Sequence, residues 1–235
     1  MTLVPLTRKD HAALRLNPAR AAQAAASVHL VPLVRSEIRK ITGQFPVFLA
    51  KDGETGEFYP AALMGLEPHE NLFWAEDRLE ASRVPLNLLR LPFFIGHDGA
   101  VMIDMASPAV DANGPVALLN ADGSDSAWFT SVQAMLGELA GGQAPTRALV
   151  DTVLAHGLVQ EVKLDLRFHN GTSAQLSGLY GLDEAALGRA LPQIADIDTV
   201  MVLAAMVLSL DHVATLVKRK NARLAAMDQW LAPQV

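Results

Sequence analysis

Three segments of the chain have the pattern of a β-hairpin, and this pattern limits the folds open to the chain more than any other feature. In the third segment, residues 162–182, apolar and charged residues alternate before the turn, which places them on opposite faces of a strand. The apolar set is Val162, Leu164, Leu166 and Phe168, and the charged set is Lys163, Asp165 and Arg167. Asn170 and Gly171 predict a two-residue turn, because both residues tolerate a positive φ.

The other two hairpins are predicted at residues 46–65 and 91–105. The first has two apolar runs around the turn-rich sequence DGETGE, and the second turns at Asp98 and Gly99. The alternation in the third hairpin indicates a sheet with one buried face and one face that is at least partly exposed to solvent, as antiparallel sheets commonly have.

Two helices are predicted between the second and third hairpins. The first covers residues 126–139, starts at Asp125 and ends at the glycine pair 141–142. The second covers residues 146–156 and follows Pro145, because proline is favoured at the start of a helix.

The last predicted helix, residues 198–230, is the longest. Its apolar seam is Leu203, Val207, Leu210, Ala214, Val217, Leu224 and Leu231. The first half is apolar on nearly every side and is therefore expected in the core. The second half is expected to be solvated, because it carries Lys218, Arg219, Lys220 and Arg223.

A further short helix is predicted at residues 31–41, whereas residues 1–30 are expected to be irregular. Strands in hairpins, with helices between and after them, predict an α+β fold with a mainly antiparallel sheet. The length of 235 residues suits a single domain over residues 1–235.

Composition excludes several classes of protein. Hydrophobic residues make up 51% of the chain and the net charge is −6, so a core is expected and a nucleic-acid partner is not. The absence of cysteine excludes disulfides, thiolate metal sites and cysteine nucleophiles.

The longest apolar run, residues 200–210, is shorter than the roughly 20 residues that span a bilayer. No signal-peptide pattern is present, so a cytoplasmic protein without a transmembrane segment is expected.

The sequence GLEPHENLFW, residues 65–74, contains a histidine followed by glutamate, as in a zinc protease motif. That motif needs a second histidine at position 73, where the chain has Phe73. The segment is therefore predicted to be a strand-to-helix junction, with Pro68, His69 and Glu70 in the first turn of the helix. The similar sequence GLYGLDEAAL predicts a second junction, capped by Asp183.

No other motif predicts a catalytic or metal centre. None of the seven histidines is followed two places later by an acid, as iron oxygenases often require. Ser177 is not in a nucleophile elbow, because Gln175 stands where that motif has a glycine, and no glycine-rich phosphate loop is present. The basic sequence KRKNAR is typical of a solvated helix end. We therefore expect no catalytic residue, no metal and no cofactor.

Five sequence blocks resemble the SapC family across nearly the whole chain: VPLTRKDHAALRL, HLVPLVRSEIRKITGQFPVFLAKD, FYPAALMGLEPHENLFW, VPLNLLRLPFFI and LSGLYGLDEAAL. Members are encoded beside S-layer secretion genes, or near TonB-dependent receptors, flavin-dependent halogenase-like proteins and cupin-like proteins. The resemblance implies an accessory role beside a modification, uptake or secretion system, and it brings no catalytic residues with it. The link EDRLEASRVP is more charged than is usual for the family.

The candidate ligand-binding residues lie near glycine turns, sheet ends or the aromatic blocks: His69, Glu70, Asn71, Trp74, Tyr59, Arg90 and Tyr180. Six aromatic residues of this region would form a partner groove if they were exposed together, or would pack in the core. They are Phe58, Tyr59, Phe73, Trp74, Phe93 and Phe94.

Three hypotheses follow for function. The first is a non-catalytic accessory protein that binds a peptide, a protein or a small ligand. The second is an enzyme with a dispersed site, acting as an iron- or flavin-linked partner in peptide modification. The third is a structural subunit that dimerises through the C-terminal helix.

Overall fold

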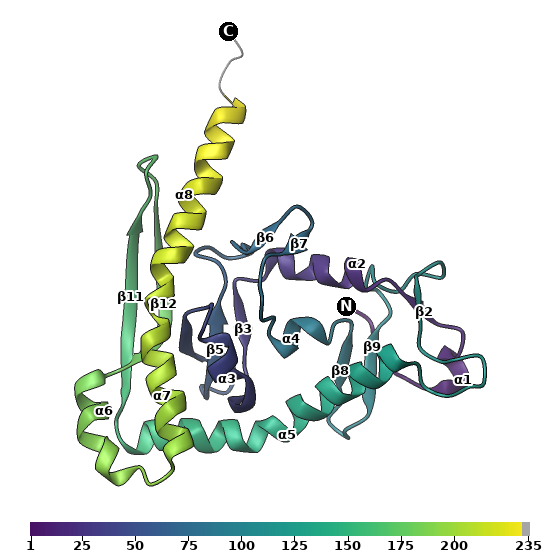
Figure 1. The fold of residues 1–235 in the computed structure, drawn as a ribbon, viewed down its shortest axis with the longest axis horizontal. Helices are drawn as coiled ribbons and strands as arrows, with labels where there is room; N and C mark the ends of the chain where they lie inside the picture. The colour runs from purple at the N-terminus through teal and green to yellow at the C-terminus, as the bar shows by residue number, and fades with distance from the viewer. Residues whose placement is uncertain (232–235) are drawn as a thin grey trace.

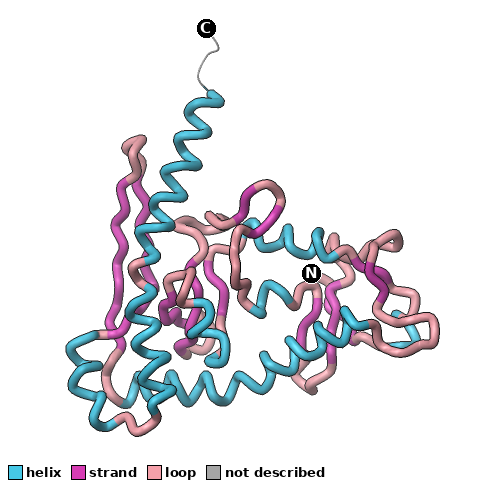
Figure 2. Tube along the Cα trace, in the orientation of Figure 1, coloured by secondary structure: helices cyan, strands magenta, loops and turns pink. Residues whose placement is uncertain are grey.

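The structure, a computed structural model, describes residues 1–231, and its largest sheet has five antiparallel strands (Figure 1). The strand order is β11-β12-β4-β5-β3. The strands are β3 (Leu30–Pro32), β4 (Val47–Lys51), β5 (Phe58–Leu63), β11 (Val159–Arg167) and β12 (Ser173–Leu182). Helices lie between and after the strands (Figure 2), so the predicted α+β class with a mainly antiparallel sheet is confirmed.

All three predicted hairpins form, namely β4–β5, β11–β12, and β8 (Phe93–Ile95) with β9 (Val101–Asp104). The predicted two-residue turn at the tip of β11–β12 is wrong. Phe168 N–H donates to the Thr172 carbonyl at 2.8 Å, which leaves a three-residue loop. Gly171 alone has a positive φ there, of 83°, as a three-residue hairpin loop requires.

The N-terminal segment, expected to be irregular, contains short regular elements. They are β1 (Leu3–Pro5), α1 (Arg8–His11), β2 (Arg15–Leu16), α2 (Pro18–Gln23) and the 3₁₀ helix η1 (Ala24–Ser27). β1 extends the β8–β9 hairpin into a three-stranded sheet, and β2 pairs with β10 (Val116–Ala117). Such short elements give no periodic pattern, and they are stabilised by partners far along the chain.

The two helices predicted between the second and third hairpins are one continuous helix, α5 (Ala127–Ala155), seen as the long teal helix in Figure 1. Gly142 does not end the helix, because it packs against Val34, and a Cβ at Gly142 would lie 2.7 Å from the Val34 Cβ. The Thr146 hydroxyl donates to the Gly142 carbonyl at 2.6 Å and accepts from the Arg35 N–H at 2.8 Å. This contact with α3 (Arg35–Ile41) stabilises α5 where its local sequence predicts an end.

The predicted C-terminal helix is two helices, α7 (Ile197–Ser209) and α8 (His212–Leu231), which follow α6 (Glu184–Ala190) and the 3₁₀ helix η2 (Leu191–Gln193). The expectation that its first half lies in the core is wrong for one face. Leu203 and Met206 are buried, but Ile197, Met201 and Leu208 are exposed. The side chain of Leu231, at the end of the predicted seam, lies outside the described part of the chain.

The helical stretch Ile197–Trp230 is long and apolar enough to cross a membrane by length and composition alone. Its most apolar window has a mean hydropathy of 2.1, and 28% of that window is buried. Core helices of soluble proteins meet the same criterion, so this finding leaves the expected absence of a transmembrane segment as a prediction.

Two hydrophobic clusters form the core, and α5 contributes to both. Phe129, Val132 and Leu136 pack with the three-stranded sheet and the N-terminal segment. Leu149 and Val153 pack with the five-stranded sheet, α3 and α7. The continuity of α5 therefore fixes how the two clusters are joined.

The close contact between α5 and α3 can be tested by adding one methyl group. We expect Gly142→Ala to destabilise the fold by about 1–3 kcal/mol, because the Val34 side chain leaves no room for the methyl. Gly137→Ala in the same helix is the control, because its Cβ meets no atom within 4 Å. It is expected to stabilise the fold by up to about 1 kcal/mol. Urea unfolding measures both values, and equal effects of the two substitutions would contradict the contact.

Candidate functional site

The segment from Gly65 to Trp74 is a tight loop, and the predicted helix start is wrong. Leu66 N–H donates to the Glu70 carboxylate at 3.0 Å, and His69 has a φ of 62°. A Cβ on Gly65 would overlap the Glu70 carbonyl. Glycine at position 65 therefore allows the chain to close on itself before a helical turn can form. The second junction is as predicted, because Asp183 caps α6.

This loop is held by a lysine of α8 that was expected to be solvated. The Lys220 ammonium lies 2.7 Å from a Glu70 carboxylate oxygen and 2.9 Å from one of Glu67, and Lys220 is only 7% exposed. Burial is the largest influence on the pKa of Lys220 and lowers it, but the hydrogen bonds to Glu70 and Glu67 outweigh burial, so the pKa is raised. Lys220 is therefore charged and fixes α8 against the loop.

Two arginines of α8 bind the same segment. Arg223 donates to the carbonyls of Asn71 and Trp74 at 3.0 and 2.9 Å. Arg219 donates to Glu80 at 3.0 Å and stacks over the Phe73 ring. The expectation of solvation is thus also wrong for these arginines, whose donors bind backbone carbonyls of the loop and the Glu80 carboxylate.

Asn71 and Glu70, two of the candidate ligand-binding residues, are engaged in holding the fold. The buried Asn71 amide donates to the Ala25 carbonyl at 2.8 Å and accepts from Phe73 N–H at 2.9 Å. Glu70 is paired as described above. The half-buried Trp74 lines a hollow of about 610 Å³ beside α8, whereas His69 is exposed. The loop contributes mainly to structure.

The remaining three candidates lie apart from this loop. Tyr59 lines a cavity of about 470 Å³ between β5 and α5, and its pKa is raised by burial and by the negative charge of Asp52. Tyr180 packs edge-on against Phe58, which strand alternation places on the opposite face from Tyr59. Arg90, after α4 (Leu86–Leu89), donates to the Phe93 carbonyl at 2.6 Å, and burial lowers its pKa.

The aromatic residues do not form one groove. Phe73 and Phe93 are buried in different clusters, and the other four are half-buried. Trp74 begins the small hairpin of β6 (Trp74–Ala75) and β7 (Arg78–Leu79). Phe73 and Phe93 are core residues, and Phe58 and Trp74 pack against the first cluster. Across residues 1–231 no group of three His, Asp or Glu side chains is placed to hold a metal ion.

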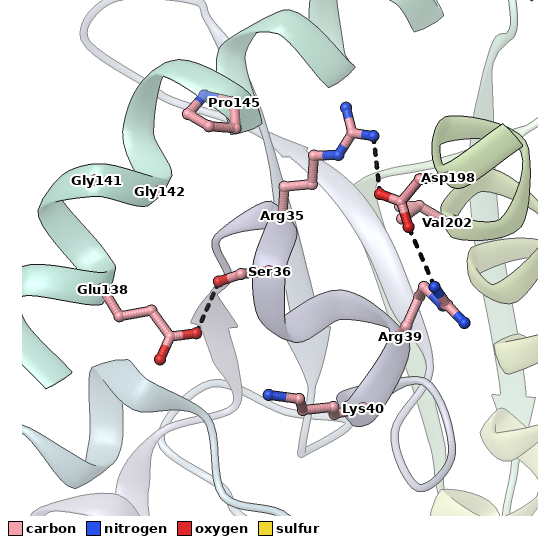
Figure 3. A pocket seen from close by; sticks show the side chains of 10 residues that line it. All are labelled: Arg35, Ser36, Arg39, Lys40, Glu138, Gly141, Gly142, Pro145, Asp198 and Val202. Atoms are coloured by element: carbon pink, nitrogen blue, oxygen red, sulfur yellow. Dashed lines mark hydrogen bonds and ion pairs between the residues drawn. The ribbon is translucent and has the colours of Figure 1, made fainter. Parts of the chain in front are cut away.

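A cavity of about 810 Å³ lies where α3, α5 and α7 meet, and it is the best candidate for a ligand site (Figure 3). α3 supplies its polar wall, and α5 and α7 supply mainly small and apolar residues. The lining residues are Arg35, Ser36, Arg39, Lys40, Glu138, Gly141, Gly142, Pro145, Asp198 and Val202. The sequence signal for this site was the i, i+4 spacing of Arg35 and Arg39 in a short helix, which places these two cations near one another.

Two of the three cations share the carboxylates at the start of α7. Arg35 donates to Asp196 and Asp198 at 2.8 and 3.0 Å, and Arg39 donates to Asp198 at 3.1 Å. The hydrogen bond to Asp196 is the main cause of the raised pKa of Arg35. The pKa of Asp196 lies well below its usual range, because its carboxylate accepts from the Thr199 hydroxyl and from Arg35.

The third cation, Lys40, is exposed and makes no salt bridge to any residue in 1–231. On the opposite wall, Pro145 has no N–H, so the Gly141 carbonyl lacks its usual i+4 donor in the helix. Gly141 is exposed. The cavity therefore has an exposed cation without a salt bridge on one wall and, on the facing wall, a backbone carbonyl without its i+4 donor.

The buried ion pair of α8 can be tested by removing its cation. Lys220→Met is expected to destabilise the fold by about 3 kcal/mol, because it leaves the nearly buried Glu70 carboxylate without a cation to balance its charge. Lys218→Met, at an exposed position of the same helix, should change stability by less than about 0.5 kcal/mol. Adding Glu70→Gln to Lys220→Met should recover part of the loss. Urea unfolding that finds Lys220→Met as mild as Lys218→Met would contradict the burial of the pair.

The electrostatic interaction between the exposed His69 and its neighbour His29 can be tested through the pKa of His29. Burial lowers the pKa of His29 from 6.5, and the positive charge of His69 lowers it further. The neutral form of His29 is favoured in the fold, so its contribution to stability is complete above pH 6.5 and is lost as pH falls through the folded pKa. His69→Asn keeps a residue that tolerates positive φ and should raise the pKa of His29 in an NMR titration. An unchanged His29 pKa would show that the two rings do not interact.

The chain matches the SapC family model over residues 6–216, which include the 65–74 loop, α3, α5 and α7. No curated protein and no solved structure matches it. The outer part of α8, which carries Lys220, lies beyond the matched range. The family resemblance of the sequence blocks is confirmed, and the chain belongs to the SapC family.

Proposed function

We propose that this chain is a non-catalytic binding protein whose ligand is an acidic peptide segment of a partner protein, held in the cavity between α3, α5 and α7. The observation that carries the proposal is Lys40, which makes no salt bridge within residues 1–231, opposite the exposed Gly141, whose carbonyl lacks its i+4 donor. A carboxylate and a backbone N–H, which occur together in an acidic peptide, would satisfy both groups.

The size and lining of the cavity support a peptide ligand. Ligand sites commonly have volumes of about 300–1,000 Å³ and combine apolar walls with a few polar groups. The volume here is about 810 Å³, and Pro145 and Val202 supply apolar surface between the polar groups. An inorganic anion would leave this surface and the Gly141 carbonyl unused, so a peptide fits the lining better.

Arg39 provides a second contact for a carboxylate. Its ion pair with Asp198 is about half exposed on both sides, and such pairs are weak because water and salt screen them. A ligand carboxylate can therefore replace Asp198 as the partner of Arg39. Arg35 is less exposed and has two carboxylate partners, so it is better suited to hold the start of α7 in place.

The family supports an accessory role for this binding. The family resemblance implies gene neighbours for S-layer secretion, TonB-dependent receptors and halogenase-like or cupin-like proteins, and a peptide-binding protein would present or retain a segment of their products. We propose the cytoplasm as the place of action. The dispersed enzyme site receives less support, because Arg90 and Tyr180 lie apart from His69 and Glu70 and each packs against other residues.

Peptide binding can be tested by fluorescence anisotropy with a labelled peptide of alternating leucine and glutamate, and with its glutamine counterpart. The acidic peptide should bind more tightly, and added salt should weaken its binding. Lys40→Gln should weaken it about tenfold, which corresponds to about 1.4 kcal/mol. Lys163→Gln, at an exposed position of β11, is the matched control and should leave it unchanged. Equal binding of both peptides, or an unaffected Lys40→Gln variant, would refute the proposal.

A further inference from the structure

We infer that the exposed face of α7 is an interface with a second copy of this chain, in which the two α7 helices pack antiparallel. One face of α7 packs on the sheet through Leu203 and Met206. The opposite face is also apolar, with Ile197 70%, Met201 45% and Leu208 71% exposed.

These three residues and the exposed Ala204 form one stripe, because steps of three and four residues return to the same side of a helix. The stripe contains no charged residue over three helical turns. A helix that is apolar on all sides is normally covered on all sides, and a contiguous exposed apolar patch marks an interaction surface. Part of the covering of α7 is therefore expected to come from another molecule.

The order of side chains in the stripe is self-complementary. In an antiparallel pair centred between positions 202 and 203, Ile197 lies opposite the partner's Leu208, and Met201 lies opposite the partner's Ala204. Each contact occurs twice, as a two-fold interface requires. Large side chains thus meet small ones at the centre and large ones at the ends, which lets the helices approach closely without overlap.

The charges beside the stripe fit this pairing. The carboxylates that adjoin it in the sequence are Asp196, Asp198 and Asp211. In the antiparallel register, Asp196 is level with the partner's Ser209. In the antiparallel register, Asp198 is level with the partner's Val207, and Asp211 with the partner's Ile194, so no two carboxylates oppose each other. Asp198 is also paired with Arg35 and Arg39 within its own chain.

A lipid surface fits the stripe less well. Helices that lie on membranes carry lysine and arginine along their polar flanks, whereas the one charged residue of α7 is Asp198. This charge pattern favours a second copy as the occupant.

The oligomeric state tests the inference, by light scattering of the full chain over a wide concentration range. The natural protein should have twice the mass of one chain, and Leu208→Glu should have the mass of one chain at the same concentrations. Leu154→Glu, at an exposed leucine of α5, should remain dimeric. Circular dichroism confirms that each variant is folded. A natural protein that stays monomeric, or a dimer that survives Leu208→Glu, would overturn the inference.

The register has its own test, because the chain has no cysteine. Met201→Cys combined with Ala204→Cys should form a disulfide-linked dimer under mild oxidation, whereas Leu154→Cys should not. Sedimentation with anionic and neutral vesicles provides the remaining comparison. Vesicle binding that Leu208→Glu abolishes, in a protein that is monomeric in solution, would assign the face to lipid instead. None of these outcomes depends on the proposed peptide site, since Leu208 does not line that cavity.

Discussion

The contact between Gly142 and Val34 is the constraint on which the functional part of the structure depends. It holds α3 directly against α5, because position 142 has no side chain to separate them. The buried Glu37 closes the same corner by accepting from the N–H groups of Val34 and Leu86 at 3.1 and 2.8 Å. The cavity exists because α3, fixed in this way, presents its cations toward α5 and α7.

A second constraint positions the C-terminal helix. The Lys220 ion pair is nearly buried, and such pairs contribute little net stability, because removing the charges from water offsets most of their attraction. They do penalise any arrangement in which one partner loses the other. Lys220, Arg219 and Arg223 therefore set where α8 lies on the 65–74 loop more than how tightly it is held.

These two constraints also explain what the sequence could and could not predict. The hairpins were predictable because period-two alternation and turn residues are local, as in β11–β12. The predicted helix end at Gly142 is wrong because Gly142 packs against Val34, which is far away in the sequence. The predicted helix start at His69 is wrong because the 65–74 loop closes tightly and gives His69 a positive φ. The prediction that Lys220 is solvated is wrong because its acidic partners lie far away in the sequence, whereas a basic run on a helix is usually solvated. The cavity combines residues from three helices and has no linear pattern except that of Arg35 and Arg39.

The two faces of α7 connect the proposed peptide site with the proposed interface. Val202 and Asp198 line the cavity, and their neighbours Met201 and Ile197 lie in the exposed stripe. A ligand carboxylate that replaces Asp198 in the ion pair with Arg39 would loosen the start of α7. At this end of α7, Ile197 must contact the partner's Leu208. Coupling between two binding sites is reciprocal, so an interface that holds α7 would in turn keep Asp198 beside Arg39 and weaken the ligand. The two sites would then compete through a single carboxylate, and the peptide would bind the monomer more tightly than the dimer.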